Sequence, residues 1–158
     1  MNRLILTLVA AVVLAACATA PTPLQGQFSA RMPDDVAQAE ASGEHVRWGG
    51  HIVQVNPQAT RSCFEIVGYP LDGSGRPLKR DRSEGRFLAC RTGFYDPEVF
   101  QAGRDITIAG TVEGFETRKV GDYDYRYARV AAEVVYLWPV RRDVDVIVQP
   151  AFYYGWWR

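Results

Sequence analysis

The stretch GRDITIAGTVEG, residues 103–114, shows the clearest strand pattern in the chain. Ile106, Ile108 and Val112 share one parity, whereas Asp105 and Thr107 take the other. Because successive side chains of a strand point to opposite faces, this alternation predicts a strand with one buried face and one polar face. The rest of the fold is built outward from this strand.

Four other segments are rich in β-forming residues and are predicted as strands. These segments are residues 45–55, 60–67, 85–90 and 123–138. In the first of them the apolar residues change parity beside Gly49 and Gly50. The last strand changes parity between Tyr127 and Val130. Such a switch is typical of a β-bulge or a sharp bend, as found in small closed barrels.

Two short helical segments are also predicted. Residues 33–43 suit a helix, since Pro33 fits a first turn and Gly43 fits the end. Residues 96–100 suit one helical turn with Asp96 as its cap. The first helix precedes all the strands, and the helical turn falls between the third and the fourth.

This order of elements matches an OB-like barrel. We therefore predict an all-β domain over residues 31–140, a barrel of five to six strands, with a β-sandwich as the alternative. The 14 glycines and 9 prolines suit such a turn-rich fold. Basic and acidic residues number 18 each, and no long basic run is present. Nucleic-acid binding normally needs a basic patch that neutralises phosphates, so we expect none.

The N-terminus carries an apolar run from Leu4 to Ala16 behind one basic residue, Arg3. A transmembrane helix needs about 20 residues, so this run is too short to cross a bilayer. Its basic start, short apolar core and small residues predict a signal peptide over residues 1–16. The end of the run, LAAC at residues 14–17, resembles the bacterial lipobox.

The lipobox implies that Cys17 takes a diacylglyceryl thioether, becomes the first residue and is then N-acylated. Several acyl chains hold a protein far more firmly than one. Ala18, where lipoproteins kept at the inner membrane usually carry aspartate, implies the outer membrane. Residues 17–30 are then the lipidated cysteine and a tether, since small residues and prolines follow. The expected partners are outer-membrane lipid and the lipoprotein processing and sorting machinery, with no other cofactor and no protein partner assigned.

Cys63 and Cys90 are the remaining cysteines and fall on two predicted neighbouring strands. The periplasm is oxidising, so a disulfide between them is expected, with two separate buried thiols as the alternative. On the chain-entropy account such a bridge would stabilise the fold by roughly 3.5 kcal/mol. The chain has no Cys-x-x-Cys motif, so redox catalysis is unsupported.

A set of short motifs runs through residues 45–139. In chain order they are VRWGGHI (46–52), PL (70–71) with GRP (75–77), SEGRF (83–87), GFYDP (93–97), GRDITIAG (103–110) and LWP (137–139). Together with LAAC they resemble the Slp family, the starvation-inducible outer-membrane lipoproteins of Gram-negative bacteria. The resemblance implies a link to starvation and stationary phase, and it provides no catalytic residues to carry over.

Candidate catalytic and metal sites are weak in this sequence. His45 and His51 lie six positions apart on one predicted strand, or about 20 Å, too far to share a metal. No serine lies in a nucleophile motif. We therefore expect no catalytic residues, no metal site and no enzymatic activity.

Two aromatic groups remain. Tyr123, Tyr125 and Tyr127 share one strand face, which suits either stacking on a sugar or cross-strand packing. Residues 141–158 form a basic and then aromatic tail, whose aromatic residues are Phe152, Tyr153, Tyr154, Trp156 and Trp157. This tail suits folding back onto the barrel, contact with the membrane interface, or contact with a partner.

The sequence therefore predicts a non-catalytic outer-membrane lipoprotein with its domain facing the periplasm. Its expected role is structural or in starvation and envelope stress. The alternative is a periplasmic module that binds a glycan or lipid fragment on an aromatic barrel face.

Overall fold

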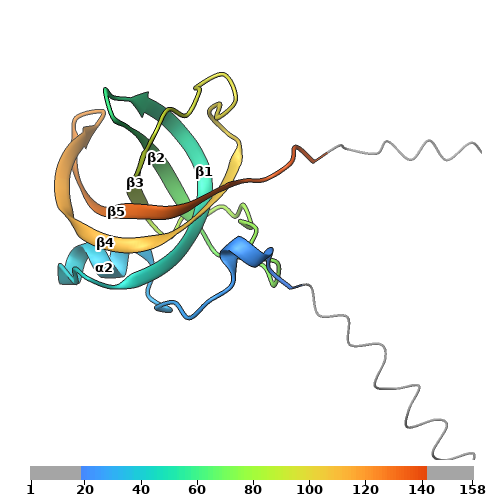
Figure 1. The fold of residues 1–158 in the computed structure, drawn as a ribbon. Helices are drawn as coiled ribbons and strands as arrows, with labels where there is room; N and C mark the ends of the chain where they lie inside the picture. The colour runs from blue at the N-terminus through green and yellow to red at the C-terminus, as the bar shows by residue number, and fades with distance from the viewer. Residues whose placement is uncertain (1–18, 142–158) are drawn as a thin grey trace, which may run out of the picture.

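Five strands of the described residues, 19–141, close into a β-barrel in the computed structural model (Figure 1). The elements in chain order are η1 (Thr22–Leu24), α2 (Pro33–Ala39), β1 (His45–Pro57), β2 (Arg61–Tyr69), β3 (Arg86–Thr92), β4 (Asp105–Val120) and β5 (Tyr123–Leu137). The strand order around the barrel is β1-β2-β3-β5-β4, and β1 pairs with β4 to complete the circle. The predicted all-β small barrel is confirmed, and the β-sandwich alternative is wrong.

The barrel depends on one parallel contact. β3 and β5 run in the same direction and pair Phe87 with Ala128 and Cys90 with Ala131, whereas every other named strand pair is antiparallel. β5 therefore lies between β3 and β4, which is the crossover expected for an OB-like barrel.

The bend predicted in β1 has a steric cause at Gly50. This residue pairs with Gly68 on one side and Ile106 on the other, and a Cβ there would lie 1.9 Å from the Val67 carbonyl oxygen. Only glycine permits such a close backbone approach. The register between β1 and β2 then shifts just beyond Ile52, which accounts for the change of parity seen in the sequence.

Apolar side chains of all five strands fill the barrel, and the chain closes both of its ends. Val36 and Ala37 of α2 join the core from one end, where α2 lies beneath the barrel in Figure 1. Away from α2, the rings of Tyr95 and Phe100 pack edge-on against Phe64, with centroids 5.3 and 5.4 Å from it. The interior is therefore a packed core.

The predicted helix over residues 33–43 is shorter than expected. α2 ends at Ala39, because Glu40 adopts a left-handed conformation (φ 48°) and the Gly43 N–H donates to the Val112 carbonyl instead of extending a helix. The single helical turn predicted over residues 96–100 is confirmed, because the Val99 and Phe100 N–H groups both donate to the Asp96 carbonyl at 3.0 Å. Its cap is present, since the Asp96 carboxylate accepts the Glu98 N–H at 2.9 Å.

Part of the segment predicted as a tether, residues 22–30, lies against the barrel. Leu24 of η1 is fully buried, and its carbonyl accepts a hydrogen bond of 2.8 Å from Arg47. Ser29 forms a parallel bridge with Val46 of β1. Burial of an apolar side chain and these backbone contacts hold residues 22–30 on the barrel.

Candidate functional site

Several predicted site residues fall outside the described part of the chain. Cys17 and the aromatic residues of the tail, Phe152, Tyr153, Tyr154, Trp156 and Trp157, lie beyond residues 19–141. Their roles stay predictions. The structure does show where the described residues next to Cys17 and next to the aromatic tail lie on the barrel.

The predicted tyrosine row does not form an open aromatic platform. Tyr123 is 70% exposed, but Tyr127 is only 1% exposed and its hydroxyl donates to Glu65 at 2.8 Å. The Tyr125 hydroxyl donates to Asp34 at 2.6 Å and accepts the Arg86 N–H at 3.1 Å. The row therefore fastens α2 and β3 to β5, and only the ring of Tyr123 faces solvent broadly.

Burial and polar contacts change the proton affinity of these phenols. Burial, reinforced by the hydrogen bond to Asp34, raises the pKa of Tyr125 to about 12. Burial and the hydrogen bond to Glu65 also raise the pKa of Tyr127, although the nearby Arg86 opposes this shift. Both phenols are therefore neutral donors at physiological pH, which suits a structural role better than acid–base catalysis.

Glu65 is a nearly buried carboxylate whose hydrogen-bonding positions are taken. Its Oε1 accepts from Arg86 and from Tyr127, each at 2.8 Å, and its Oε2 accepts from Gln54 at 3.1 Å. A buried carboxylate with a cation and two further donors is satisfied in its charged form. This group therefore joins β1, β2, β3 and β5 on the outer side of the barrel.

Cys63 and Cys90 face each other across β2 and β3, and their sulfur atoms are bonded. The two residues are direct partners in the ladder, with a Cα–Cα distance of 4.1 Å. The pair therefore staples two strands that the sheet already places side by side.

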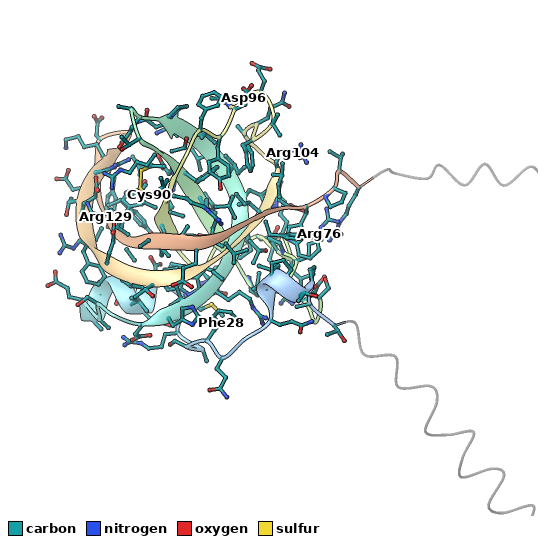
Figure 2. All side chains as sticks on the ribbon, in the orientation of Figure 1. Phe28, Arg76, Cys90, Asp96, Arg104 and Arg129 are labelled. Carbon is teal, nitrogen blue, oxygen red and sulfur yellow. A yellow bond between two sulfur atoms is a disulfide. The ribbon has the colours of Figure 1, made fainter. Side chains whose placement is uncertain are left out.

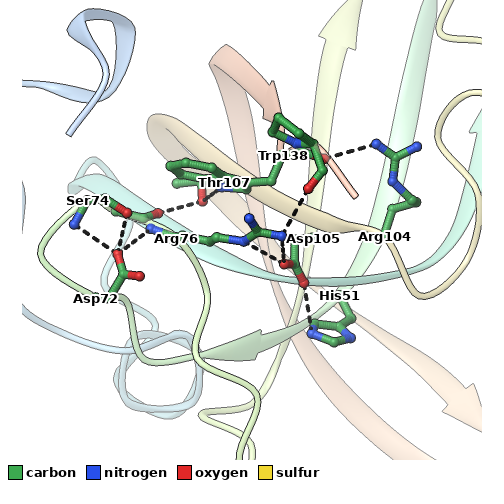
Figure 3. Close-up of polar contacts among 10 residues, drawn as sticks. His51, Asp72, Ser74, Arg76, Arg104, Asp105, Thr107 and Trp138 are labelled. Carbon is green, nitrogen blue, oxygen red and sulfur yellow. Dashed lines mark hydrogen bonds and ion pairs between the residues drawn. The ribbon is translucent and has the colours of Figure 1, made fainter. Parts of the chain in front are cut away.

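A polar cluster gathers residues from four of the sequence motifs (Figure 3). Arg76 and His51 both contact the Asp105 carboxylate, at 2.7 and 3.1 Å. Burial outweighs the attraction of Asp105 and lowers the pKa of His51, so its ring is mostly neutral near pH 7. The neutral ring then donates its Nε2–H to Asp105. Because the His51 ring is neutral, the Arg76 guanidinium is the positive charge that balances the Asp105 carboxylate.

The same cluster ties the last strand to the loop after β2. Arg76 donates to the Pro139 carbonyl at 3.0 Å, and Arg104 donates to the Trp138 carbonyl at 2.9 Å. The Trp138 indole donates to Thr107 at 2.9 Å. These bonds fix the backbone where the described chain leaves the barrel, on the side of Arg76 and Arg104 in Figure 2.

The described chain also begins at this loop. A Cβ at Gly75 would lie 3.6 Å from the Ala20 Cβ and 3.7 Å from the Leu24 Cδ1. Figure 1 shows both ends of the described chain on one side of the barrel, away from the turn that joins β4 to β5. The loop over residues 70–82 therefore lies between the two ends.

A hollow of about 280 Å³ opens between this loop and the chain end. Lys79, Arg141, His51 and Asp105 line it together with Pro77 and Leu78. Lys79, Arg80, Arg82 and Arg141 are all exposed, and within residues 19–141 none of these four cations has an ion-pair partner. Sequence reasoning missed this group because its four members are separated by Asp81 and by distance along the chain.

Asp72 holds the loop over residues 70–82 in its turn conformation through hydrogen bonds to Ser74 and Arg76. Its Oδ1 accepts from the Ser74 hydroxyl at 2.6 Å and from the Ser74 and Arg76 N–H groups at 2.8 and 3.0 Å. Burial alone raises the pKa of Asp72, but these hydrogen bonds and the charge of Arg141 outweigh it and lower the pKa. Asp72 is thus a charged turn residue, which agrees with the turn-rich loop expected from the sequence.

A second hollow, of about 400 Å³, lies between the segment before α2 and the start of β1. Phe28, Arg47, Trp48 and Tyr69 are among its lining residues. The Arg47 guanidinium lies 5.1 Å from the centroid of the Phe28 ring. Aromatic side chains and the Arg47 guanidinium therefore line this hollow together.

The two histidines contact different carboxylates. His45 is exposed and approaches Glu133 at 3.6 Å, whereas His51 contacts Asp105 on another part of the barrel. Among residues 19–141, no group of three or more His, Cys, Asp and Glu side chains is placed to hold a metal ion. In the same part of the chain, no helix has the length and apolar character needed to cross a membrane.

Comparison with known proteins gives one family. The family model described as "Outer membrane lipoprotein Slp family" matches residues 14–158. Escherichia coli K12 has two similar proteins. "Uncharacterized lipoprotein YeaY" is 30% identical over 151 residues, 92% of this chain and 78% of the relative. "Outer membrane protein Slp" is 26% identical over 137 residues, 84% of this chain and 72% of the relative.

A third relative is an "Uncharacterized protein" of Haemophilus influenzae. It is 33% identical over 101 residues, 63% of this chain and 55% of the relative. No solved structure matches the chain.

Proposed function

Because the chain belongs to the outer membrane lipoprotein Slp family, we propose that it is a non-catalytic barrel held at the outer membrane by acylated Cys17. The barrel faces the periplasm and has a structural role in the cell envelope under starvation or stress. The signal peptide over residues 1–16 is removed, and the processing and sorting machinery for lipoproteins handles the chain.

The observation that carries this proposal is the position of Ala20 beside the loop at Gly75, where an added Cβ on Gly75 would lie 3.6 Å from the Ala20 Cβ. A fully extended chain advances at most about 3.6 Å per residue, so the Cys17 Cα lies within about 11 Å of the Ala20 Cα. Acyl chains on Cys17 would therefore hold this side of the barrel close to the lipid surface. A short connection of this kind supports a domain that works at the membrane.

The polar groups of the barrel support the non-catalytic part of the proposal. Glu65 is held by three side chains and Asp105 by two, so each carboxylate has its hydrogen-bonding capacity directed at the fold. Acid–base catalysis needs a group whose proton is free to move to a substrate. These carboxylates instead join strands and loops.

Membrane fractionation of the Cys17→Ser and Ala18→Asp variants tests the anchor. The wild-type chain is expected in the outer membrane, and Cys17→Ser is expected to lose that location because the lipid cannot be attached. Ala18→Asp keeps the thiol and is expected at the inner membrane, which makes it the matched control for expression. If Cys17→Ser stays in the outer membrane at the wild-type level, the anchor is wrong.

Binding of a glycan or lipid fragment is the second candidate function. The tyrosine row is largely engaged in packing, so the observation that favours this function is the 400 Å³ hollow beside Phe28 and Trp48. A ligand there would raise the melting temperature in a screen of periplasmic glycans and lipid fragments. Trp48 is 3% exposed and is part of the core, so Phe28→Ala is the variant expected to abolish such a shift.

A further inference from the structure

Four exposed cations belong to the loop over residues 70–82 and to the end of the described chain. Lys79, Arg80 and Arg82 lie in this loop, and the loop passes close to Ala20 at Gly75, where an added Cβ would lie 3.6 Å from the Ala20 Cβ. Arg141 lines the 280 Å³ hollow together with Lys79. The cationic face, defined as these four residues, is thus assembled from two distant parts of the chain.

The acidic residues near the cationic face compensate only part of its charge. Asp105 is paired with Arg76 and contacts His51, whereas Asp72 accepts only from the neutral Ser74 hydroxyl and two backbone N–H groups, so it keeps its charge, which acts on Arg141. Asp81 is exposed and is the other carboxylate within the loop. Four exposed cations therefore outnumber the two carboxylates of the loop, Asp72 and Asp81.

The basic residues at the far side of the barrel are arranged differently. Arg118 pairs with Glu116 at 2.5 Å, Lys119 pairs with Asp124 at 3.0 Å, and both lie beside the turn between β4 and β5. A paired surface cation adds little attraction for an external anion, since its charge is already screened by its partner. The contrast between the two sides singles out the cationic face.

The geometry points to a specific orientation: the cationic face lies on the membrane, and the hollow between Lys79 and Arg141 binds the phosphate of an anionic lipid headgroup. This inference rests on the proposed anchor at Cys17 and adds a contact that the anchor does not require. Exposed basic residues next to a membrane attachment are attracted to anionic lipids, by about five-fold in affinity for each residue. The anchor would hold the barrel at the surface, and the phosphate contact would fix which side faces it.

The two lysines of the chain provide a built-in comparison. Lys79 belongs to the cationic face, and Lys119 lies beside the far turn with its side chain 65% exposed. The acylated full chain, purified from membranes, is reconstituted into vesicles of phosphatidylglycerol or of phosphatidylcholine. A water-soluble amine reagent then labels both lysines, and mass spectrometry measures the ratio of Lys79 to Lys119 modification.

In phosphatidylglycerol vesicles the ratio is expected to fall about five-fold below its value in phosphatidylcholine vesicles, and high salt is expected to restore it. The double variant Arg80→Gln/Arg82→Gln should lose most of this protection, whereas Arg118→Gln, the control at the far turn, should keep it. The replaced side chains in the double variant are exposed and have no ion-pair partner among the described residues, so folding is not at risk.

Four results would overturn the inference. Equal labelling of Lys79 and Lys119 in phosphatidylglycerol vesicles would exclude the orientation, while flotation of the chain with those vesicles would show that the anchor stands. Equal protection in both lipids, insensitive to salt, would exclude selection of an anionic headgroup, because phosphatidylcholine also carries a phosphate. Protection by inorganic phosphate in phosphatidylcholine vesicles would assign the hollow to a soluble anion. A chain that fails to float with any vesicle would overturn the proposed anchor and this inference together.

Discussion

The Trp138 indole donates a hydrogen bond of 2.9 Å to the Thr107 hydroxyl, and this hydroxyl is fully buried. Thr107 in turn donates to the Gly75 carbonyl at 2.8 Å. One hydroxyl of β4 thus links the end of β5 to the loop that passes beside Ala20. The two ends of the described chain are held together by this relay and by Arg76.

Replacement of Thr107 by valine should destabilise the barrel by about 2–3 kcal/mol, because it leaves the Trp138 N–H and the Gly75 carbonyl buried without partners. Urea unfolding followed by tryptophan fluorescence measures this loss. Thr111→Val is the matched control, since the Thr111 hydroxyl is at an exposed site on the same strand, and its effect should stay within about 0.5 kcal/mol. Equal stability of the two variants would contradict the relay.

Replacement of Gly50 by alanine should destabilise the barrel by about 3 kcal/mol or more, because the new Cβ would meet the Val67 carbonyl where β1 pairs with β2. Gly114→Ala is the control in β4, where a new Cβ would meet only the Arg129 side chain, at 3.9 Å. This change should cost nothing or stabilise by up to about 1 kcal/mol. A Gly50→Ala protein with wild-type stability would show that β1 does not bend at that point.

Loss of the Cys63–Cys90 bridge should lower the free energy of unfolding by roughly 3.5 kcal/mol on the chain-entropy account. The double variant Cys63→Ser/Cys90→Ser should unfold at the same urea concentration with and without a reducing agent. The wild-type chain should be weakened by the reducing agent to about the same level. Two free thiols at these positions in denatured, unreduced protein from the periplasm would contradict the bridge.

Alkaline pH should reveal the buried position of Tyr125. Burial and Asp34 raise its pKa to about 12 in the fold, above the value of about 10 in the unfolded chain. The stabilisation is therefore fully present below pH 10 and is lost as the pH rises from about 10 toward 12. The stability difference between wild type and Tyr125→Phe should shrink across this range.

Tyr123→Phe is the control for that titration, because the Tyr123 ring is 70% exposed. Its stability near neutral pH should match that of the wild type within about 0.5 kcal/mol. A Tyr125→Phe protein whose difference from wild type stays constant between pH 9 and pH 11 would contradict the burial of the phenol.

The strands of this barrel could be predicted because their signals are local. The alternation around Ile106 and Ile108 follows from the pleat of a strand, and the parity change that follows Gly49 and Gly50 reflects the register shift just beyond Ile52. The burial of Leu24 could not be predicted, since its partners come from elements far along the chain. The row containing Tyr127 was ambiguous for the same reason: parity shows which face a ring takes but not what covers it.

The cationic face was hidden from sequence reasoning by its assembly in space. Lys79, Arg80 and Arg82 are interrupted by Asp81, and Arg141 joins them only because Arg76 binds the Pro139 carbonyl. The overall charge of zero gives no sign of such a local excess. A net charge constrains the whole surface, whereas recognition depends on which cations lack a partner.

The central claim is that the thiol of Cys17 carries the lipid that holds this barrel at the outer membrane. Mass spectrometry of the N-terminal peptide from membrane-extracted protein tests it most directly. The account predicts a peptide that begins at Cys17 and carries the added mass of a diacylglyceryl group and an N-acyl chain. An unmodified N-terminus that begins at another residue would contradict it.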